Sequence, residues 1–355
     1  MKGARVTVTG ATGHLGNVLV RHLLERGAKV TAVVRPTSDL TALEELELQR
    51  VEGDVRDQAS LARAFEGAEV VFHCAGLVSI TAGKEAQLTE TNVEGTRNVV
   101  EACIAAKVKR LVFTSSVHAL TEPKAGGTLD ESGGFDPATA HGAYGKSKAA
   151  ASKLVQEAAR AGRLDAVLVL PTGVLGPHDY LCSEAAPMLG LAGRGRVPII
   201  IAGGYDWVDV RDVADGTIAA AERGRTGEAY LLNHQSLTNV ELCGIVAKAA
   251  GVRPPWLALP LWLARVLAYG GLAWELVTGR RALLTPYAVH TVSKDFAISW
   301  AKAKAELGFA PRPIEATLAD AWSWQSTDPN SPLLKRLRVA PARRALLGHG
   351  PTAPD

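Results

Sequence analysis

Short apolar runs alternate with longer segments of helical periodicity through the first half of the chain. The runs are rich in valine and leucine, which suits strands of a buried sheet. In the longer segments, apolar residues recur three and four positions apart, which is the spacing of one helix face. The predicted strands are 5–10, 29–34, 47–54, 69–76, 110–116 and 166–173, and the predicted helices are 15–27, 60–67, 92–106 and 143–162.

The regular alternation of strand and helix predicts an α/β fold. Parallel strands need a long crossover between them, and a helix usually supplies it. We therefore expect residues 1–176 to form a Rossmann-type, doubly wound parallel sheet with helices on both faces.

The pattern changes after Gly176, where proline, glycine and tryptophan become frequent and strands become rarer. A helical pattern at 207–224 and an apolar run at 228–233 indicate that the chain returns to the sheet domain at about 206–233. The remaining parts are expected to form a smaller, mostly helical substrate-binding cap, made of 177–205 and 234–327.

Composition describes a globular chain without an obvious nucleic-acid partner. The 355 residues are 47% hydrophobic and 21% charged, enough for about two domains, and the formal net charge is only +3. The four cysteines lie far apart with no C-x-x-C pair, so we expect neither a metal site nor a disulfide framework. We expect a cytoplasmic location and no signal peptide, because the first predicted strand begins at Arg5.

The last residues, 328–355, form a basic tail. No acidic residue lies between Asp328 and Asp355, and the segment is rich in proline, arginine and alanine. We interpret it as a solvated, mobile end, and an anchor to anionic lipid is the less favoured alternative. Its basic residues are Lys335, Arg336, Arg338, Arg343 and Arg344.

One apolar segment, 256–274, is long enough to span a bilayer. Pro260 and the Gly270-Gly271 pair interrupt it, however, and Arg265 would lie near the centre of the membrane at a considerable cost. We interpret the segment as buried or amphipathic helices of the substrate domain. Contact with a membrane surface is the less favoured alternative.

Three glycines lie where the first strand passes into the first helix. Gly10 permits a sharp turn, Gly13 lets the backbone approach a pyrophosphate, and Gly16 lets helix and strand pack closely. The helix N-terminus would face the phosphates. A tight turn alone is the plainer alternative, but the position at a strand-to-helix junction predicts dinucleotide binding.

The end of the second strand bears on the choice of cofactor. NAD-specific folds usually place an acidic residue there, and NADP-specific folds place an arginine for the extra phosphate. Here Arg35 occupies the position, with Thr37 and Ser38 as further donors. A guanidinium suits a phosphate dianion, so we favour NADP(H) over NAD(H), the alternative being a solvent-facing arginine.

Tyr144 and Lys148 lie four positions apart in the long helical segment 143–162, which places both on one helix face. A nearby ammonium favours the phenolate, so we expect Lys148 to lower the pKa of Tyr144 toward neutrality. The strand before this helix ends in hydroxyl-bearing residues, 114–116, at the edge of the sheet where a cleft would lie. The three features together predict a proton-transfer site.

From about residue 4 to 325 the chain resembles an extended short-chain dehydrogenase/reductase of the NAD-dependent epimerase/dehydratase superfamily. Within it, the chain is more similar to the dihydroflavonol reductase and 3β-hydroxysteroid dehydrogenase branch than to nucleotide-sugar epimerases, because V-H-A-L follows the serines instead of V-Y-G. The matching motifs keep the family's order: T-G-A-T-G-H-L-G (9–16), G-D-V-R-D (53–57), H-C-A-G (73–76), N-V-E-G-T-R-N (92–98), T-S-S (114–116), Y-G-K-S-K (144–148), P-T-G-V-L-G-P (171–177) and W-V-D-V-R-D-V-A (207–214).

The resemblance implies a catalytic role for three residues. Ser116 would hydrogen-bond the substrate oxygen, Tyr144 would donate a proton to it, and Lys148 would hold the nicotinamide ribose and tune the tyrosine. Ser115 is the alternative catalytic hydroxyl. Relatives commonly form dimers through their long helices, so the resemblance also suggests a homodimer.

The resemblance also implies a set of cofactor contacts. Asp54 and Val55 would border the adenine, Ala75 and Gly76 would pass along the ribose and phosphates, and Asn92 would face the cofactor. Pro171, Thr172 and Val174 would line the nicotinamide. The full predicted set is Gly10, Thr12, Gly13, His14, Leu15, Gly16, Arg35, Ser38, Asp54, Val55, Ala75, Gly76, Asn92, Ser115, Pro171, Thr172 and Val174.

Several other polar residues have plainer interpretations. His14 packs or caps the turn, and His118 and His141 are more simply surface or supporting residues than substrate contacts. The acidic cluster at 206–212 looks like a metal site. The resemblance instead makes Asp209, Arg211 and Asp212 structural ties between domains.

Together these features predict an NADP(H)-dependent oxidoreductase that interconverts a carbonyl and an alcohol on an apolar small molecule, such as a steroid-like, polyketide-like or phenylpropanoid ketone. One alternative is a nucleotide-sugar epimerase or dehydratase with tightly bound NAD. The other is a non-catalytic NADP-binding regulator, which the presence of both Tyr144 and Lys148 disfavours.

Overall fold

A seven-stranded parallel sheet forms the centre of the molecule, in the order β11-β7-β5-β4-β1-β2-β3. The computed structural model describes residues 1–79, 83–197, 199–278, 286–294 and 296–335. The inner strands are largely buried on both faces, as their apolar runs require, and every residue of β7 is buried, whereas the edge strand β3 is mostly exposed. The strands of this sheet are β1 (Arg5–Thr9), β2 (Lys29–Val34), β3 (Gln49–Glu52), β4 (Val70–His73), β5 (Arg110–Thr114), β7 (Ala166–Pro171) and β11 (Ala229–Leu232).

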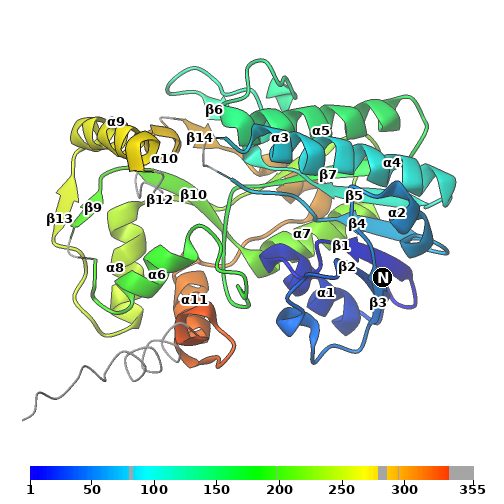
Figure 1. The fold of residues 1–355 in the computed structure, drawn as a ribbon, viewed down its shortest axis with the longest axis horizontal. Coiled ribbons are helices and arrows are strands. Elements are labelled where there is room, and N and C mark those ends of the chain that lie inside the picture. The colour runs from blue at the N-terminus through cyan, green and yellow to red at the C-terminus, as the bar shows by residue number, and fades with distance from the viewer. Residues whose placement is uncertain (80–82, 198, 279–285, 295, 336–355) are drawn as a thin grey trace, which may run out of the picture.

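Helices cover both faces of this sheet, which confirms the doubly wound α/β fold (Figure 1). One apolar core lies between the sheet and the pair α1 and α7, and a second lies between the sheet and α2, α4 and α5. The covering helices are α1 (His14–Glu25), α2 (Gln58–Ala64), α4 (Gly95–Ala105), α5 (Gly142–Arg160) and α7 (Val210–Arg223).

The strand order reverses at β1, which lies between β2 and β4. Connections leave β1 and β4 toward opposite sides of such a sheet, so a crevice opens outside the carboxyl ends of these strands. The residues after β1, β2, β4 and β5 therefore meet along one edge.

The cap contains two small sheets and several helices. After Gly176 the chain returns to the main sheet through helix α7, which packs on one face, and strand β11, which pairs with β7. The strand before α7, β10 (Gly204–Asp209), pairs instead with β8 (Gly173–Leu175) and β12 (Gln235–Thr238) in a small sheet. The other cap elements are α6 (Ala186–Ala192), β9 (Ile199–Ile201), α8 (Asn239–Ala249), β13 (Leu257–Leu259), α9 (Leu261–Thr278), α10 (Pro286–Thr291) and α11 (Ile314–Thr327), and short strands β6 (Thr128–Leu129) and β14 (Ala297–Ile298) pair beside α5.

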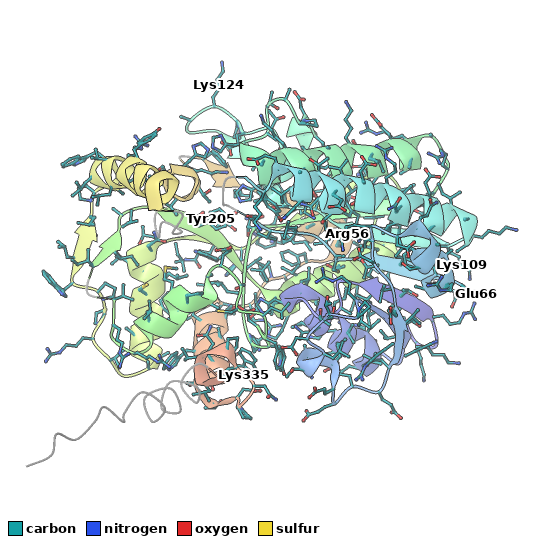
Figure 2. All side chains as sticks on the ribbon, viewed as in Figure 1. Arg56, Glu66, Lys109, Lys124, Tyr205 and Lys335 are labelled. Atoms are coloured by element: carbon teal, nitrogen blue, oxygen red, sulfur yellow. The ribbon has the colours of Figure 1, made fainter. Side chains whose placement is uncertain are left out.

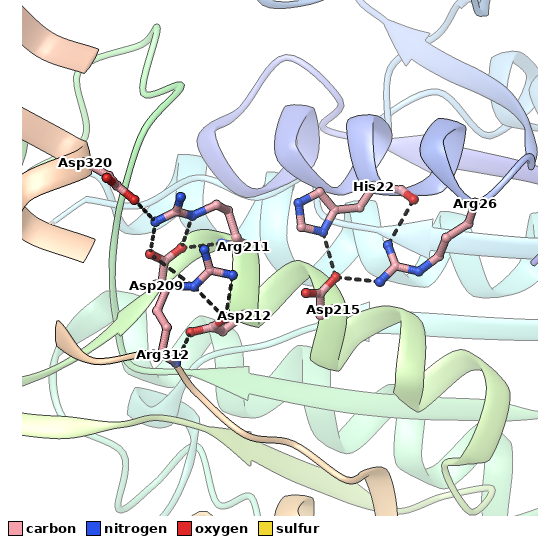
Figure 3. Close-up of polar contacts among 8 residues, drawn as sticks. All are labelled: His22, Arg26, Asp209, Arg211, Asp212, Asp215, Arg312 and Asp320. Atoms are coloured by element: carbon pink, nitrogen blue, oxygen red, sulfur yellow. Dashed lines mark hydrogen bonds and ion pairs between the residues drawn. The ribbon is translucent and has the colours of Figure 1, made fainter. Parts of the chain in front are cut away.

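Ion pairs on α7 join the sheet domain to the rest of the chain (Figure 3). Asp209 caps α7 through the Arg211 amide and pairs with the Arg211 guanidinium, which also reaches Asp320 on α11 at 2.7 Å. Arg312 pairs with Asp212 at 2.9 Å. These contacts make Asp209, Arg211 and Asp212 structural ties rather than a metal site.

The apolar segment 256–274 is not buried as a whole. Trp256, Trp262 and Tyr269 are exposed, while Ala264 and Ala268 face the interior. Of the two predicted possibilities, buried or amphipathic helices, full burial does not hold for the described side chains: α9 has one buried and one exposed face, and the exposed face carries the large apolar residues. None of the helices among the described residues has the length and hydropathy of a membrane span. Of the basic tail, 336–355 lie outside the described residues.

Candidate active site

The glycine turn after β1 is tightly constrained. Gly10 has φ +70°, and a Cβ there would lie 2.6 Å from the backbone nitrogen of Ala75. A Cβ on Gly16 would collide with the Gly10 carbonyl oxygen. Gly13 begins α1 without a side-chain cap, so the first amides of the helix point into the crevice region. The glycines thus let β1, the loop after β4 and the start of α1 pack closely, which is the arrangement that places a helix N-terminus at the pyrophosphate of a dinucleotide.

The first turn of α1 is tied to the chain that enters the cap. His14 Nε2 lies 3.0 Å from the Pro177 carbonyl oxygen, so its ring is held by protein. Asn17 Nδ2 donates to the carbonyls of Gly13 at 2.8 Å and His178 at 3.0 Å. Asn17 was not predicted as a site residue, because the sequence does not show that it contacts His178, which lies 161 positions away. Thr12 and Leu15 lie half-buried in the same turn.

Arg35 lies directly after β2 and its side chain is exposed at the carboxyl edge of the sheet. Its amide donates to Ser38 Oγ at 3.2 Å, which makes Ser38 the closing residue of the turn. Asp54 follows β3, and both of its carboxylate oxygens accept hydrogen bonds from the Arg56 guanidinium. The hydrogen bonds of Arg56 lower the pKa of Asp54, and the charge of Arg35 acts in the same direction, so Arg35 lies near Asp54.

Two of the next predicted cofactor contacts, Val55 and Ala75, already make backbone hydrogen bonds within the protein. The Val55 side chain is buried, and its carbonyl accepts from Asn98 Nδ2 at 2.9 Å. The Ala75 amide donates to Thr9 Oγ1 at 3.3 Å, joining the ends of β1 and β4. Gly76 is exposed, and a Cβ there would lie 3.4 Å from both Asn92 Oδ1 and Lys148 Nζ. Gly76 therefore leaves open the space beside Lys148.

Asn92 lies in a π-helical segment (Thr89–Glu94) that leads into α4. The sequence predicts an ordinary helix over 92–106, and a π-bulge of this kind often marks a functional site. The Asn92 amide bonds both backbone groups of Leu77 and donates to Ser147 Oγ at 3.0 Å. Asn92 thus fixes the loop after β4 against α5, and its side chain is buried.

Ser116, Tyr144 and Lys148 come together at the carboxyl end of β5. The Ser116 hydroxyl hydrogen-bonds Tyr144 and lowers the pKa of the phenol, but burial is the larger effect and raises it to about 12. Lys148 Nζ donates to the Thr114 carbonyl at 2.8 Å, and burial lowers the pKa of Lys148 to about 8. The expectation that Lys148 brings the tyrosine pKa toward neutrality is not met in this structure. Desolvation dominates at the phenol, and the ammonium is directed to the strand end.

Ser115 points the other way. Its hydroxyl lies 2.5 Å from Ser152 Oγ on α5, and its amide donates to the Val169 carbonyl of β7. Ser115 therefore joins the strand to the helix, while Ser116 lies beside Tyr144.

The nicotinamide-side residues predicted at 171–174 follow β7. Pro171 is its last residue, Thr172 donates its hydroxyl to the buried carboxylate of Asp206 at 2.9 Å, and Val174 belongs to β8. The three residues form the path by which the chain leaves the main sheet for the cap.

A histidine and a tyrosine line the cap side of Tyr144. His118 Nε2 lies 2.8 Å from the Tyr205 hydroxyl, and the His118 ring meets the Tyr144 ring edge-on at 6.0 Å. Burial lowers the pKa of His118 to about 3, so the ring is neutral. Figure 2 marks Tyr205 on β10, where the chain passes between the sheet and the cap. Tyr205 was missed from the sequence, because its strand partners and its distance from His118 depend on how the cap folds back.

His141 is further from the reacting groups. It precedes α5, and its ring stacks on that of His290 with centroids 3.7 Å apart. His141 therefore packs against the cap helix α10, which agrees with the prediction that it supports the structure rather than contacts the substrate.

A family profile settles the relationship. The profile described as "NAD dependent epimerase/dehydratase family" matches residues 6–232, which hold the glycine turn, Ser116, Tyr144 and Lys148. The chain belongs to the NAD-dependent epimerase/dehydratase family.

Two relatives and one solved structure are similar to most of the chain. Sterol demethylase protein B of Methylococcus capsulatus is 33% identical over 322 residues, covering 89% of this chain and 97% of that protein. The 3beta-hydroxysteroid-dehydrogenase/decarboxylase isoform 1 of Arabidopsis thaliana is 31% identical over 336 residues, covering 86% of this chain and 75% of that protein. The crystal structure of gox2253 is 32% identical, with a TM-score of 0.79, covering 91% and 98% of the two chains.

Membership in the NAD-dependent epimerase/dehydratase family makes the chain an oxidoreductase of the extended short-chain type that uses a nicotinamide cofactor and a small-molecule substrate. The glycine cradle and the open position at Gly76 fit that cofactor. The family assignment also confirms the resemblance seen in the sequence.

Proposed function

We propose that the protein is an NADP(H)-dependent reductase that converts a ketone or aldehyde of a fairly apolar small molecule into an alcohol. The observation that carries this proposal is the grouping of three buried residues, Ser116, Tyr144 and Lys148, at the carboxyl end of β5, where the Ser116 hydroxyl acts on the Tyr144 phenol. These are the groups needed to hold a carbonyl oxygen and give it a proton.

Tyr144 acts as the general acid. Burial keeps its phenol protonated, with a pKa raised to about 12, so a proton is available at neutral pH. Ser116 donates a hydrogen bond to the same substrate oxygen and orients it toward the phenol. Since the site is buried, each of these hydrogen bonds is stronger than in water.

Lys148 supplies positive charge at the cofactor side of the site. Its ammonium is fixed on the Thr114 carbonyl and faces the space left by Gly76. From this position it would hold the nicotinamide ribose through hydrogen bonds. Bound nicotinamide supplies the hydride for the carbonyl carbon.

Arg35 supports NADP(H) over NAD(H). It is exposed directly after β2, and the carboxylate that follows the next strand, Asp54, is already engaged by Arg56. The Asp54 carboxylate is therefore already neutralised by Arg56, and the Arg35 guanidinium is available to bind the 2′-phosphate of NADP(H).

The names of the relatives support an apolar substrate. One is a sterol demethylase protein and another a hydroxysteroid dehydrogenase/decarboxylase. Tyr205 is half-buried beside His118 on the cap side of the site, and its ring packs edge-to-face at 5.3 Å on the buried Trp207. An aromatic lining of this kind suits a ring system better than a charged sugar nucleotide.

The rival function is an epimerase or dehydratase that keeps its cofactor. Solved structures with such names share the fold at 23% identity or less in the cases of UDP-glucose epimerase and dTDP-glucose dehydratase. A likeness of that size supports the fold alone and leaves the reaction open.

The deciding experiment is a panel of steroid-like, polyketide-like and phenylpropanoid carbonyls with NADPH and NADH in parallel, followed by absorbance of the reduced cofactor. We expect net consumption of NADPH with at least one apolar ketone. Stoichiometric NAD in the purified protein, with no net cofactor consumption and turnover of a nucleotide sugar, would overturn the proposal. No turnover of any kind, with NADP bound, would favour a regulator.

A further inference from the structure

Helix α9 carries its small residues inward and its large apolar residues outward. Ala264 and Ala268 are fully buried and pack with Val289 and the partly buried Ile201. Trp262 and Tyr269 are each 66% exposed. In an ordinary surface helix the large apolar side chains face the core, so this arrangement leaves an apolar stripe uncovered.

The stripe continues onto the neighbouring two-stranded sheet. Leu257 of β13 is paired with Ile199 of β9, and both side chains are exposed, as is Trp256 at 76%. Figure 1 shows α9, β13 and β9 together at the end of the molecule opposite the main sheet. We call this set the aromatic face: Ile199, Trp256, Leu257, Trp262, Val266 and Tyr269.

Three arginines lie on the segments that form the aromatic face. Arg196, Arg253 and Arg265 are exposed beside it. No aspartate or glutamate occurs in the sequence from 185 to 205 or from 242 to 274. Trp262, Arg265, Val266 and Tyr269 are spaced by three and four, so the arginine lies within the apolar stripe.

We propose that the aromatic face docks on an anionic phospholipid surface. Tryptophan and tyrosine prefer the boundary between hydrocarbon and headgroups, where the ring is buried and the polar edge stays hydrated. Arginine beside them binds lipid phosphate. α9 lies along the surface in this arrangement, as an interfacial helix does.

The charge pattern selects lipid over a second copy of the chain. A two-fold contact through this stripe would bring Arg265 into a water-poor interface beside its own counterpart, and the first acidic residue along the same helix, Glu275, is ten positions away. An unpaired buried charge is strongly destabilising. A lipid headgroup, in contrast, supplies the missing anion.

The aromatic face also lies close in the fold to the active site. A Cβ on Gly203 would contact Leu261 at the start of α9, and two residues later Tyr205 bonds His118 beside Tyr144. Under the proposed function, docking would hold the cap against the membrane in which an apolar ketone dissolves. The docking itself does not depend on that function.

The test is co-sedimentation of the full-length protein with vesicles, in the absence of substrate. Vesicles of phosphatidylcholine alone are compared with vesicles of phosphatidylcholine and phosphatidylglycerol in equal parts. We expect binding to the anionic vesicles that weakens as salt is raised. Replacing both outward aromatics, Trp262→Ser with Tyr269→Ser, should reduce the partition coefficient by roughly tenfold or more, and Arg265→Glu should reduce binding to the anionic vesicles selectively.

The matched controls are Val240→Ser, an exposed apolar residue on α8, and Arg63→Glu, an exposed cation on α2. Both should bind vesicles like the unmodified protein, and all variants should melt within a few degrees of it, since every replaced side chain is exposed. Full binding by the Trp262→Ser/Tyr269→Ser variant would refute the proposal and point to another segment, such as the basic tail. A vesicle-free dimer that this variant dissociates would refute it in favour of a second copy. The readout requires no catalysis, so it remains valid if no carbonyl is reduced.

Discussion

Lys148 Nζ donates a 2.8 Å hydrogen bond to the main-chain carbonyl of Thr114. The ammonium is thus carried by α5 but held by the end of β5, and its Nζ lies 5.0 Å from the ring centre of Phe113. The lysine approaches the reacting groups from a fixed point on the sheet, one helical turn from Tyr144.

The pH dependence of reduction should follow Lys148. Burial lowers its pKa to about 8, while the pKa of Tyr144 is raised to about 12. Below pH 8 both groups hold their protons, and above it Lys148 loses its charge first, so kcat/KM for ketone reduction should fall as the pH rises through 8. Initial rates across the alkaline range test this. A profile that stays flat up to about pH 10, near the ordinary lysine pKa, would contradict it.

Lys148→Met is the matched variant for that profile. It removes the ionisation while keeping an unbranched side chain, so the remaining activity should be low and independent of pH in this range. A variant that keeps the same decline near pH 8 would assign the decline to another group.

Replacing the two neighbouring serines should have different effects. Ser116 bonds Tyr144, so Ser116→Ala should lower kcat/KM roughly 10²-fold, the usual cost of one positioned donor. Ser115 bonds Ser152, so Ser115→Ala should lower the melting temperature with a much smaller loss of activity. Paired kinetics and thermal melts separate the two, and the reverse pattern would make Ser115 the catalytic hydroxyl.

Removing the phenol should stop proton transfer. Tyr144→Phe is expected to lower kcat about 10²- to 10⁴-fold, the range for loss of a general acid. Binding of NADPH, measured by fluorescence titration, should be nearly unchanged. Retention of the biological activity by this variant would support the binding-only alternative.

Arg35 should control cofactor preference. Arg35→Asp is expected to raise the KM for NADPH by about ten- to a hundredfold, the cost of losing a charged hydrogen bond, with a smaller effect on NADH. Arg63→Glu, a charge change on exposed α2, serves as the control. A wild-type enzyme that prefers NADH would refute the role of Arg35.

The two ion-pair groups of Figure 3 should contribute differently to the free energy of unfolding. The Asp209 side chain is fully buried between Arg211 and Arg312, so Asp209→Asn should lower the free energy of unfolding by about 3–5 kcal/mol. Asp215 pairs with His22 and Arg26 but is 42% exposed, so Asp215→Asn should cost less than about 1 kcal/mol. Thermal melts compare them. Asparagine still caps a helix well, so the effect at Asp209 reports the charge rather than the cap.

Local signals were sufficient for the main sheet and for the order of the site motifs. Apolar runs predicted the strands β1, β2, β4, β5 and β7 because these are largely buried on both faces. The edge strand β3, which is mostly exposed, was also predicted, within the alternation of strand and helix. The glycine spacing predicted the turn at Gly10 because no other residue adopts its φ of +70° so close to Ala75. The pairing of β10 with β8 and β12 was not predicted, since the sequence around 204–209 does not show which strands it will meet.

The sequence by itself determined the fold, the family and the pairing of Tyr144 with Lys148, since each rests on residues near one another along the chain. Tertiary structure decided three further matters: Ser116 rather than Ser115 faces Tyr144, Tyr205 reaches His118, and α9 turns Trp262 and Tyr269 outward. The physical reason is that burial depends on what packs against a residue from elsewhere in the chain. An apolar run at 256–274 reads the same whether its tryptophans fill a core or face a lipid surface.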